Sequence, residues 1–133
     1  MPTKDQIKHA MHTHFDAWNA LDRARWESNF ADDIVFEDPV GGPTKVGAEA
    51  VKLSWDNSFK GDETWKIEPL LMQICADQAA CLVKSTRISG GEKLEIKGIE
   101  VYTINNEGKV AYIRTWFTPP EGMVLDPYFM EAH

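Results

Sequence analysis

Four long runs of alternating apolar and polar residues constrain the fold of this chain more than any other feature. They cover Glu63–Cys75, Ala79–Ser89, Lys93–Ile104 and Val110–Thr118. Alternation with period two is typical of strands, and β-branched and aromatic residues favour the same structure. The breaks between the runs are short, and short links favour antiparallel hairpins over crossover connections. The second half of the chain therefore predicts an antiparallel sheet.

The first half predicts three helices. Apolar residues recur at steps of three and four through Lys4–Leu21. Asp22 is a typical N-cap for a short second helix that continues to Phe30, and Gly47–Phe59 predicts a third. We therefore expect a single α+β domain over residues 1–133, in which a cone-shaped curved antiparallel sheet wraps around three N-terminal helices. Such a cone encloses an apolar pocket.

Charge and apolar patterning exclude several classes of function. The net charge is −7 and no basic run is present, which argues against a nucleic-acid partner. No apolar stretch is long enough to cross a bilayer, and Met1–Lys8 lacks the core of a signal peptide. We expect a cytoplasmic protein whose Cys75 and Cys81 are reduced. The apolar tail after Pro119-Pro120 is expected to pack on the body or on a partner chain.

A short strand that ends in Val35–Pro39 places one carboxylate on an apolar face. Neighbouring side chains of a strand point to opposite faces, so Asp38 is in phase with Ile34 and Phe36, and Glu37 is not. A carboxylate in an apolar interior is costly unless it is paired, and catalytic acids and bases often occupy such positions. Asp before Pro also commonly starts a turn, so turn capping is the alternative.

Glu100 is a second carboxylate on an apolar strand face. It shares a phase with Leu94, Ile96, Tyr102 and Ile104. Gly98 in the same run is a typical bulge position, which would reset the phase of the residues before it. The alternative is a glutamate at the sheet edge that pairs with Lys84, Arg87 or Arg114.

His14 is the third titratable residue on an apolar face, the seam of the first helix. Two carboxyl groups in one apolar site cannot both ionise cheaply, so one acts as a base and the other stays protonated as a donor. Asp38, Glu100 and His14 together suit proton abstraction next to a carbonyl, and also suit dehydration or epoxide opening. His9 and His12 have helical metal-pair spacing, but no third ligand is evident. We expect no metal and no organic cofactor.

Several stretches resemble ketosteroid isomerase and, more broadly, the nuclear transport factor 2-like superfamily with its SnoaL-like polyketide cyclases. They are Phe30-Ala31-Asp32-Asp33, Phe36–Gly41, Pro43 with Gly47-Ala48-Glu49, and the turn Asn106–Lys109. The resemblance implies that Asp38 is the base that moves a proton between two carbons of a 3-oxo-Δ5 steroid. It also implies that Glu100 takes the place of a protonated aspartic acid, and that two copies of the chain pair through the outer sheet face.

The resemblance has departures as well. His14 occupies the position of the family's catalytic Tyr, and Phe30 and Trp55 occupy the positions of two supporting tyrosines. Loss of one oxyanion donor typically lowers the rate by about a hundredfold or more. The residues expected to contact the substrate are Phe15, Trp18, Trp55, Tyr102, Trp116 and Phe117.

Three functions follow from these observations. The first is a cofactor-free isomerase for a steroid or similar flat apolar ketone. The second is a dehydratase, cyclase or epoxide hydrolase that uses His14 with Asp38. The third is a non-catalytic module for small-molecule binding or assembly. All three concern a small, apolar, oxygenated ligand or a partner copy, and none needs nucleic acid or a membrane.

Overall fold

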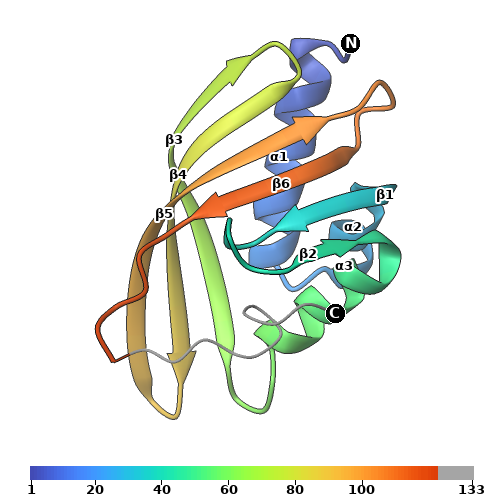
Figure 1. The fold of residues 1–133 in the computed structure, drawn as a ribbon. Helices are drawn as coiled ribbons and strands as arrows, with labels where there is room; N and C mark the ends of the chain where they lie inside the picture. The colour runs from blue at the N-terminus through green and yellow to red at the C-terminus, as the bar shows by residue number, and fades with distance from the viewer. Residues whose placement is uncertain (123–133) are drawn as a thin grey trace.

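A computed structural model describes residues 1–122 and shows a six-stranded sheet curved over three helices (Figure 1). The elements are α1 Lys4–Asn19, α2 Arg23–Ser28, β1 Phe30–Glu37, β2 Thr44–Val46, α3 Gly47–Ser58, β3 Thr64–Cys75, β4 Gln78–Ser89, β5 Glu92–Ile104 and β6 Val110–Trp116. The strand order is β2-β1-β6-β5-β4-β3. The expected α+β fold is confirmed. The expectation for the apolar tail concerns residues 123–133, which lie outside the described residues.

Helix α1 is fixed at both ends. At its start, the Thr3 side chain accepts from the Gln6 backbone N–H, and the Gln6 side chain accepts from the Thr3 N–H. This capping box satisfies two of the donors that a helix N-terminus leaves exposed. At its end, the Asn19 amide donates to the Ile67 carbonyl at 2.6 Å and accepts from the Ile67 N–H at 2.9 Å. The helix is therefore held against β3.

The sheet is antiparallel except for one pair. Strands β3, β4, β5 and β6 form successive antiparallel hairpins, as the short links predict. Strand β1 runs parallel to β6. This direction is open to the two strands because they are far apart in the chain and no hairpin turn joins them. Strand β2 was not predicted. Residues 39–43 form a turn rich in proline and glycine, after which the chain folds back and pairs antiparallel with β1 over three residues.

The predicted end of the second helix was wrong. Helix α2 ends at Ser28, and Phe30 is the first residue of β1. Asp32 and Asp33, which follow it, are exposed residues within β1. Trp26 and Phe30 still meet, with ring centroids 4.8 Å apart. An aromatic pair that fits one turn of helix is therefore brought together here by the bend from α2 into β1.

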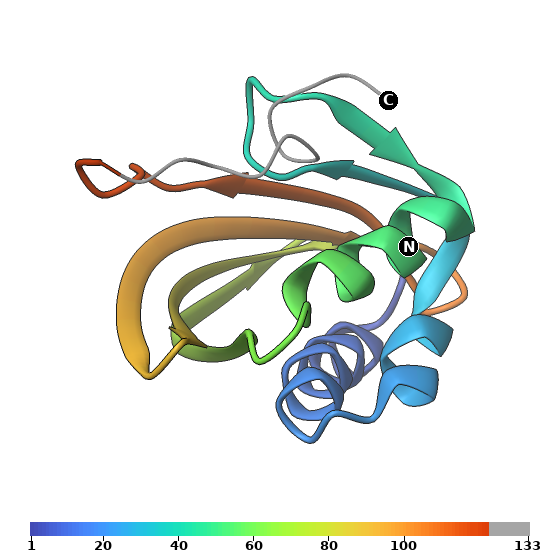
Figure 2. The ribbon, with the colours of Figure 1, turned by 90° about the horizontal axis from the view of Figure 1, so that it is seen from below.

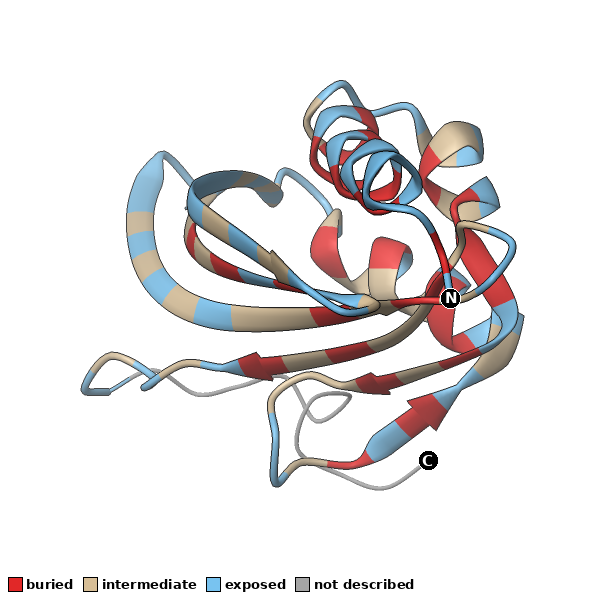
Figure 3. Ribbon diagram, turned by 90° about the horizontal axis from the view of Figure 1, so that it is seen from above, coloured by how far each residue is buried: buried red, intermediate tan, exposed pale blue. Residues whose placement is uncertain are grey.

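The core lies between the concave side of the sheet and the helices (Figures 2 and 3). Ile7 and Met11 of α1 pack there with Ile34, Val83 and other fully buried residues. Both cysteines are free, as expected. Since Cys75 pairs with Gln78 and Cys81 with Met72, the two thiols do not face each other across the hairpin. No helix in residues 1–122 is long and apolar enough to span a membrane.

Gly98 does not form the bulge that its position predicts. The β4–β5 register continues through it without a shift, and Gly98 lies opposite Val83. Gly98 instead allows the backbone at the end of β6 to approach β5 closely. A Cβ at this position would lie 2.9 Å from the Trp116 carbonyl oxygen and 3.3 Å from the Phe117 Cβ. The missing side chain lets the end of β6 lie tightly against β5, and the phase of Glu100 is undisturbed.

We therefore expect Gly98→Ala to destabilise the protein by about 1–3 kcal/mol, the usual cost of overpacking. The contact is with backbone, which cannot rotate away as a flexible side chain would. Urea unfolding monitored by tryptophan fluorescence measures the change in free energy. Lys97→Ala, one residue earlier on the exposed side of β5, is the control and should change stability by less than about 0.5 kcal/mol. Equal stability of Gly98→Ala and wild type would contradict the role given to this glycine.

Candidate active site

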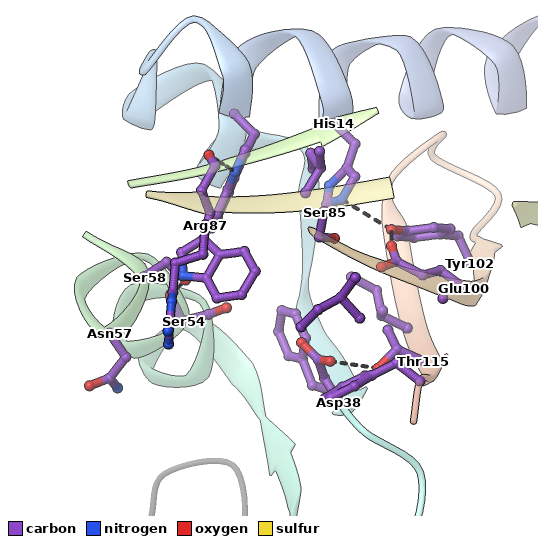
Figure 4. A pocket seen from close by; sticks show the side chains of 18 of the residues that line it. His14, Asp38, Ser54, Asn57, Ser58, Ser85, Arg87, Glu100, Tyr102 and Thr115 are labelled. Carbon is purple, nitrogen blue, oxygen red and sulfur yellow. Dashed lines mark hydrogen bonds between the residues drawn. The ribbon is translucent and has the colours of Figure 1, made fainter. Parts of the chain in front are cut away.

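The inner face of the sheet and the helices enclose a cavity of about 390 Å³ (Figure 4). This volume is in the usual range for small-molecule sites. Its apolar lining comes from Trp18, Trp26, Phe36, Trp65, Ile67, Ile96, Ile113, Trp116 and Phe117. The space is broad and aromatic, with a few polar groups set into its walls.

Asp38 lines the cavity just beyond the end of β1. Thr115 of β6 donates its hydroxyl hydrogen to Asp38 Oδ1 at 2.5 Å, and the Val40 N–H bonds the Thr115 carbonyl at 2.8 Å. These bonds fix the turn after β1 beside β6. Burial raises the pKa of Asp38, while the Thr115 bond and the charge of Lys45 act in the opposite direction. The carboxylate is thus a stronger base than one in water, because burial is the largest effect.

Lys45 is a charged group near this carboxylate that sequence reasoning missed. It is buried on β2, opposite Phe36 of β1. Burial lowers the pKa of Lys45, and the nearby Asp38 raises it. The three-residue edge strand that carries it was not predicted, so no strand phase was assigned to Lys45. Its positive charge favours the ionised form of Asp38.

Glu100, Tyr102 and His14 form a hydrogen-bonded chain on another wall (Figure 4). The Tyr102 hydroxyl donates to Glu100 Oε1. Since the phenol hydrogen is used there, His14 Nε2, at 3.3 Å, is the donor to the Tyr102 oxygen. His14 Nδ1 has no hydrogen-bond partner among the described residues. The β5–β6 register places Glu100 directly opposite Thr115, the residue that holds Asp38.

Burial governs the protonation of these three hydrogen-bonded side chains. It raises the pKa of Glu100 to about 7, and the Asp38 charge adds to the rise while the Tyr102 bond opposes it. It lowers the pKa of His14 to about 4, so the imidazole is neutral near pH 7. Burial and the Glu100 charge raise the pKa of Tyr102 well above its usual value. Near neutral pH the site therefore holds a neutral phenol, a neutral imidazole and a glutamic acid that is partly protonated.

The predicted contact residues divide into two groups. Trp18, Tyr102, Trp116 and Phe117 line the cavity. Phe15 and Trp55 do not, which corrects the expectation for these two residues: both are buried in the core. The Trp55 ring is packed on its neighbours, with centroids 5.2 Å from Trp18 and 4.6 Å from Phe59. Helical periodicity placed Trp55 on the apolar face of its helix, but this spacing does not distinguish a side chain in the core from one that lines the cavity.

Glu100 does not pair with any of the three basic residues that were considered as alternative partners. Lys84 pairs with Glu68 at 3.3 Å, and Arg87 lies 3.7 Å from Glu63. Arg114 lies over Trp116, with its guanidinium carbon 5.2 Å from the ring centroid. The partner of Glu100 is Tyr102, two residues along the same strand face. Sequence reasoning had named Tyr102 only as an aromatic contact, although its shared phase with Glu100 was a usable signal.

No metal site is evident in the described part of the chain. His9 and His12 are exposed on α1, and no group of three or more His, Cys, Asp or Glu side chains in residues 1–122 is placed to hold an ion.

Several polar residues that line the cavity were not predicted from the sequence. They are Ser54, Asn57, Ser58, Glu63, Ser85, Arg87 and Thr115. Thr115 had a strand-phase signal, as it shares a face with Ile113.

Comparison with known proteins identifies the family. A model of the SnoaL-like domain matches residues 11–113. The chain belongs to the SnoaL-like domain family. A steroid Delta-isomerase from Nocardioides simplex is 25% identical over 122 residues, which are 92% of this chain and 97% of that protein. The resemblance to ketosteroid isomerases and the nuclear transport factor 2-like superfamily is thereby confirmed at the level of family and fold.

Solved structures share the SnoaL-like fold. RV0760c from Mycobacterium tuberculosis, in complex with estradiol-17beta-hemisuccinate, aligns with a TM-score of 0.73 at 23% identity and covers 85% of this chain and 94% of that one. An epoxide hydrolase from the same organism aligns with a TM-score of 0.74 at 18% identity, with coverages of 87% and 84%. At these identities the likeness shows the fold alone.

Proposed function

We propose that this SnoaL-like protein is a cofactor-free isomerase that moves a carbon–carbon double bond in a steroid or similar flat apolar ketone. The observation that carries the proposal is the placement of Asp38 and Glu100 on the walls of one apolar cavity. Burial raises the pKa values of both, and the Asp38 charge further disfavours ionisation of Glu100. One carboxylate and one carboxylic acid is the combination that enolate chemistry needs.

In the proposed reaction Asp38 takes a proton from the carbon next to the ketone. The electron pair of that C–H bond moves toward the ketone oxygen, which becomes an enolate. Protonated Glu100 donates a hydrogen bond to this oxygen. The Tyr102 hydroxyl, which donates to Glu100 Oε1, makes that acid a stronger donor. Asp38 then returns its proton to a carbon further along the conjugated system. The double bond has moved, and no atom has been gained or lost.

His14 has a supporting role in this scheme. It is neutral, and its Nε2–H holds the Tyr102 oxygen so that the phenol keeps its direction. In this proposal, the hydrogen bonds from His14 to Tyr102 and from Tyr102 to Glu100 take over the role of the family's catalytic tyrosine, whose position His14 occupies. Names of similar proteins support the ligand class: one relative is called a steroid Delta-isomerase, and one structural neighbour was solved with an estradiol derivative.

The direct test is the ultraviolet absorbance of a 3-oxo-Δ5 steroid during incubation with the purified protein. Conjugation of the double bond with the ketone increases the absorbance, and we expect turnover without any added metal or cofactor. A protein that binds the conjugated product but never forms it from the Δ5 ketone would contradict the isomerase assignment and favour the binding-module alternative.

The dehydratase, cyclase or epoxide hydrolase alternative needs His14 to act with Asp38. His14 contacts Tyr102 and aromatic rings, while the Asp38 carboxylate accepts the Thr115 hydroxyl bond. A histidine whose pKa is lowered to about 4 is also a weak base. These observations favour the isomerase over this second class.

We also propose a homodimer formed through the outer face of the sheet in the cytoplasm. One apolar residue from each of four neighbouring strands lies in a row across that face, because Leu71 pairs with Leu82, Leu82 with Ile99, and Ile99 with Trp116. Trp116 is the last residue of β6, and it also borders the cavity at that end of the strand. Leu71 is 55% exposed and Ile99 is 47% exposed. A contiguous exposed apolar row of this kind is typical of a protein–protein contact.

We expect Ile99→Asp to weaken the dimer by about a hundredfold or more, because a carboxylate would be buried at the centre of the apolar row. Light scattering after gel filtration over a range of concentrations measures the change. Val46→Asp is the matched control, since Val46 is 59% exposed on edge strand β2 and outside the row. A wild-type protein that stays monomeric at high concentration, or an Ile99→Asp dimer as tight as wild type, would contradict this interface.

A further inference from the structure

The cavity has a second polar cluster, away from the wall that carries Asp38 and Glu100. Figure 4 shows Arg87, Ser54, Ser58 and Asn57 on one side, and Asp38, Glu100 and Tyr102 on the other. Nothing in the proposed proton transfer uses the first group. We call Ser54, Asn57, Ser58, Glu63 and Arg87 the distal cluster. It is made by the last turns of α3, the residue before β3 and the inner face of β4.

Arg87 is placed in the distal cluster by the sheet. The β3–β4 register sets it directly opposite Trp65, and its guanidinium carbon lies 6.0 Å from the centroid of that ring. Its Nε lies 3.7 Å from Glu63 Oε1, which is an ionic contact longer than a hydrogen bond. Guanidinium and carboxylate therefore offset each other in charge, while both remain able to bond a polar group of a ligand.

Helix α3 adds neutral hydrogen-bonding groups. Ser58 donates its hydroxyl hydrogen to the Ser54 carbonyl at 2.8 Å, so the Ser58 oxygen keeps its capacity as an acceptor. The Asn57 side chain lines the same part of the cavity, and an amide both donates and accepts. The distal cluster thus presents donors and acceptors together, with a formal charge that sums to zero.

We infer that the distal cluster binds a hydroxyl group at the end of the substrate opposite to its reacting ketone. A hydroxyl accepts from a donor such as Arg87 and donates to an acceptor such as Glu63. An anionic group would place a second negative charge beside Glu63, and it has no hydrogen to donate to that carboxylate. The inference rests on the proposed function and sharpens it: the substrate is a flat apolar ketone with an uncharged hydroxyl at its far end.

Binding of three 3-oxo-Δ4 steroids that differ only at carbon 17 tests this inference. They carry a hydroxyl, a hydrogen or a sulfate, and tryptophan fluorescence reports binding because Trp18 and Trp65 line the cavity. Hydrogen bonds to charged groups predict that the hydroxyl ligand binds about ten- to a hundredfold more tightly than the hydrogen analogue. The sulfate is expected to bind no better than the hydrogen analogue. Equal dissociation constants for hydroxyl and hydrogen, or tightest binding of the sulfate, would overturn the inference.

Arg87→Met removes the charged donor but keeps an unbranched side chain over Trp65. It should abolish the preference for the hydroxyl and leave the affinity for the hydrogen analogue within about twofold. Lys84→Met is the matched control, because Lys84 of β4 also pairs with a glutamate, Glu68 of β3, but does not line the cavity. That variant should keep the wild-type preference. A retained preference in Arg87→Met would overturn the role of Arg87, and the comparison of ligands on wild-type protein does not depend on this variant folding.

The binding experiment separates this inference from the isomerase proposal. A hydroxyl preference in a protein that does not turn over the Δ5 ketone would support the distal cluster and contradict the proposed reaction. Turnover with no hydroxyl preference would do the reverse. For an active enzyme, Arg87→Met should raise KM for the hydroxylated Δ5 ketone about tenfold or more with kcat little changed, since the distal contact is made equally in ground and transition states. Failure of all three ligands to bind would contradict both.

Discussion

Replacing Asp38 by asparagine is expected to lower kcat for isomerisation of a 3-oxo-Δ5 steroid by about a hundred- to ten-thousandfold, the usual contribution of a general base. The amide has the shape of the carboxyl group, and its oxygen still accepts the Thr115 hydroxyl bond. It cannot take a proton from carbon. Loss of kcat with little change in the binding of the conjugated product would therefore report the missing base.

Glu37→Gln is the matched control for this substitution. Glu37 is the preceding residue, points away from the cavity and accepts the Tyr112 hydroxyl bond on the other side of the sheet. The same change of carboxylate to amide at that position should leave kcat within about threefold of wild type. Turnover that survives Asp38→Asn, or that falls equally in both variants, would contradict Asp38 as the base.

Strand phase predicted the part of the site that lies on regular structure. Asp38, in phase with Phe36, faces the cavity, and so does Glu100, in phase with Ile96 and Tyr102. The rule works because side chains alternate strictly and the β4–β5 register has no shift. For the same reason Glu37 was correctly assigned to the opposite face. A two-residue period leaves only two choices for each side chain, and the apolar neighbours decide between them.

The sequence could not show which distant residues meet. His14 is 88 residues from Tyr102, and nothing local indicated that its partner would be that phenol and not Asp38. Trp55 and Trp18 have the same helical signature, yet only Trp18 reaches the cavity. The distal cluster was missed for a related reason: Arg87, Ser54 and Asn57 are ordinary polar residues along the chain, and only the curvature of the sheet over α3 brings them to one cavity.

Because the pKa of Glu100 is raised, we expect activity to fall as the pH rises and this side chain ionises. Below its pKa of about 7 the side chain is an acid that donates to the ketone oxygen. As pH rises through 7 it becomes a carboxylate, which donates nothing and repels the enolate. We therefore expect kcat/KM, which reports the free enzyme, to rise with pH as Asp38 ionises and to fall again with an alkaline limb near pH 7. The ionised phenol does not contribute to this limb, because the pKa of Tyr102 is raised well above its usual value.

Glu100→Gln should remove the alkaline limb of the pH profile and lower the maximum rate by about ten- to a hundredfold, since an amide N–H is a weaker donor than a carboxylic acid. His14→Gln is the control: the pKa of His14 is about 4, so its loss should leave the alkaline limb in place. An alkaline limb that persists in Glu100→Gln, or disappears in His14→Gln, would contradict the assignment.

The same raised pKa has a consequence for stability that does not depend on any substrate. A carboxyl whose pKa rises from 4.5 to about 7 on folding stabilises the folded state below pH 4.5, and that contribution is lost as pH rises through 7. The shift corresponds to about 3 kcal/mol between these limits. The lowered pKa of His14 adds stability over the same pH range, so the Glu100 contribution is measured as a difference between variants. From pH 5 to pH 8, urea unfolding should show a change in stability that is less favourable for wild type than for Glu100→Gln by about 3 kcal/mol. A kinetic limb without the matching change in stability would mean that another group titrates, so the two measurements together assign the proton to Glu100.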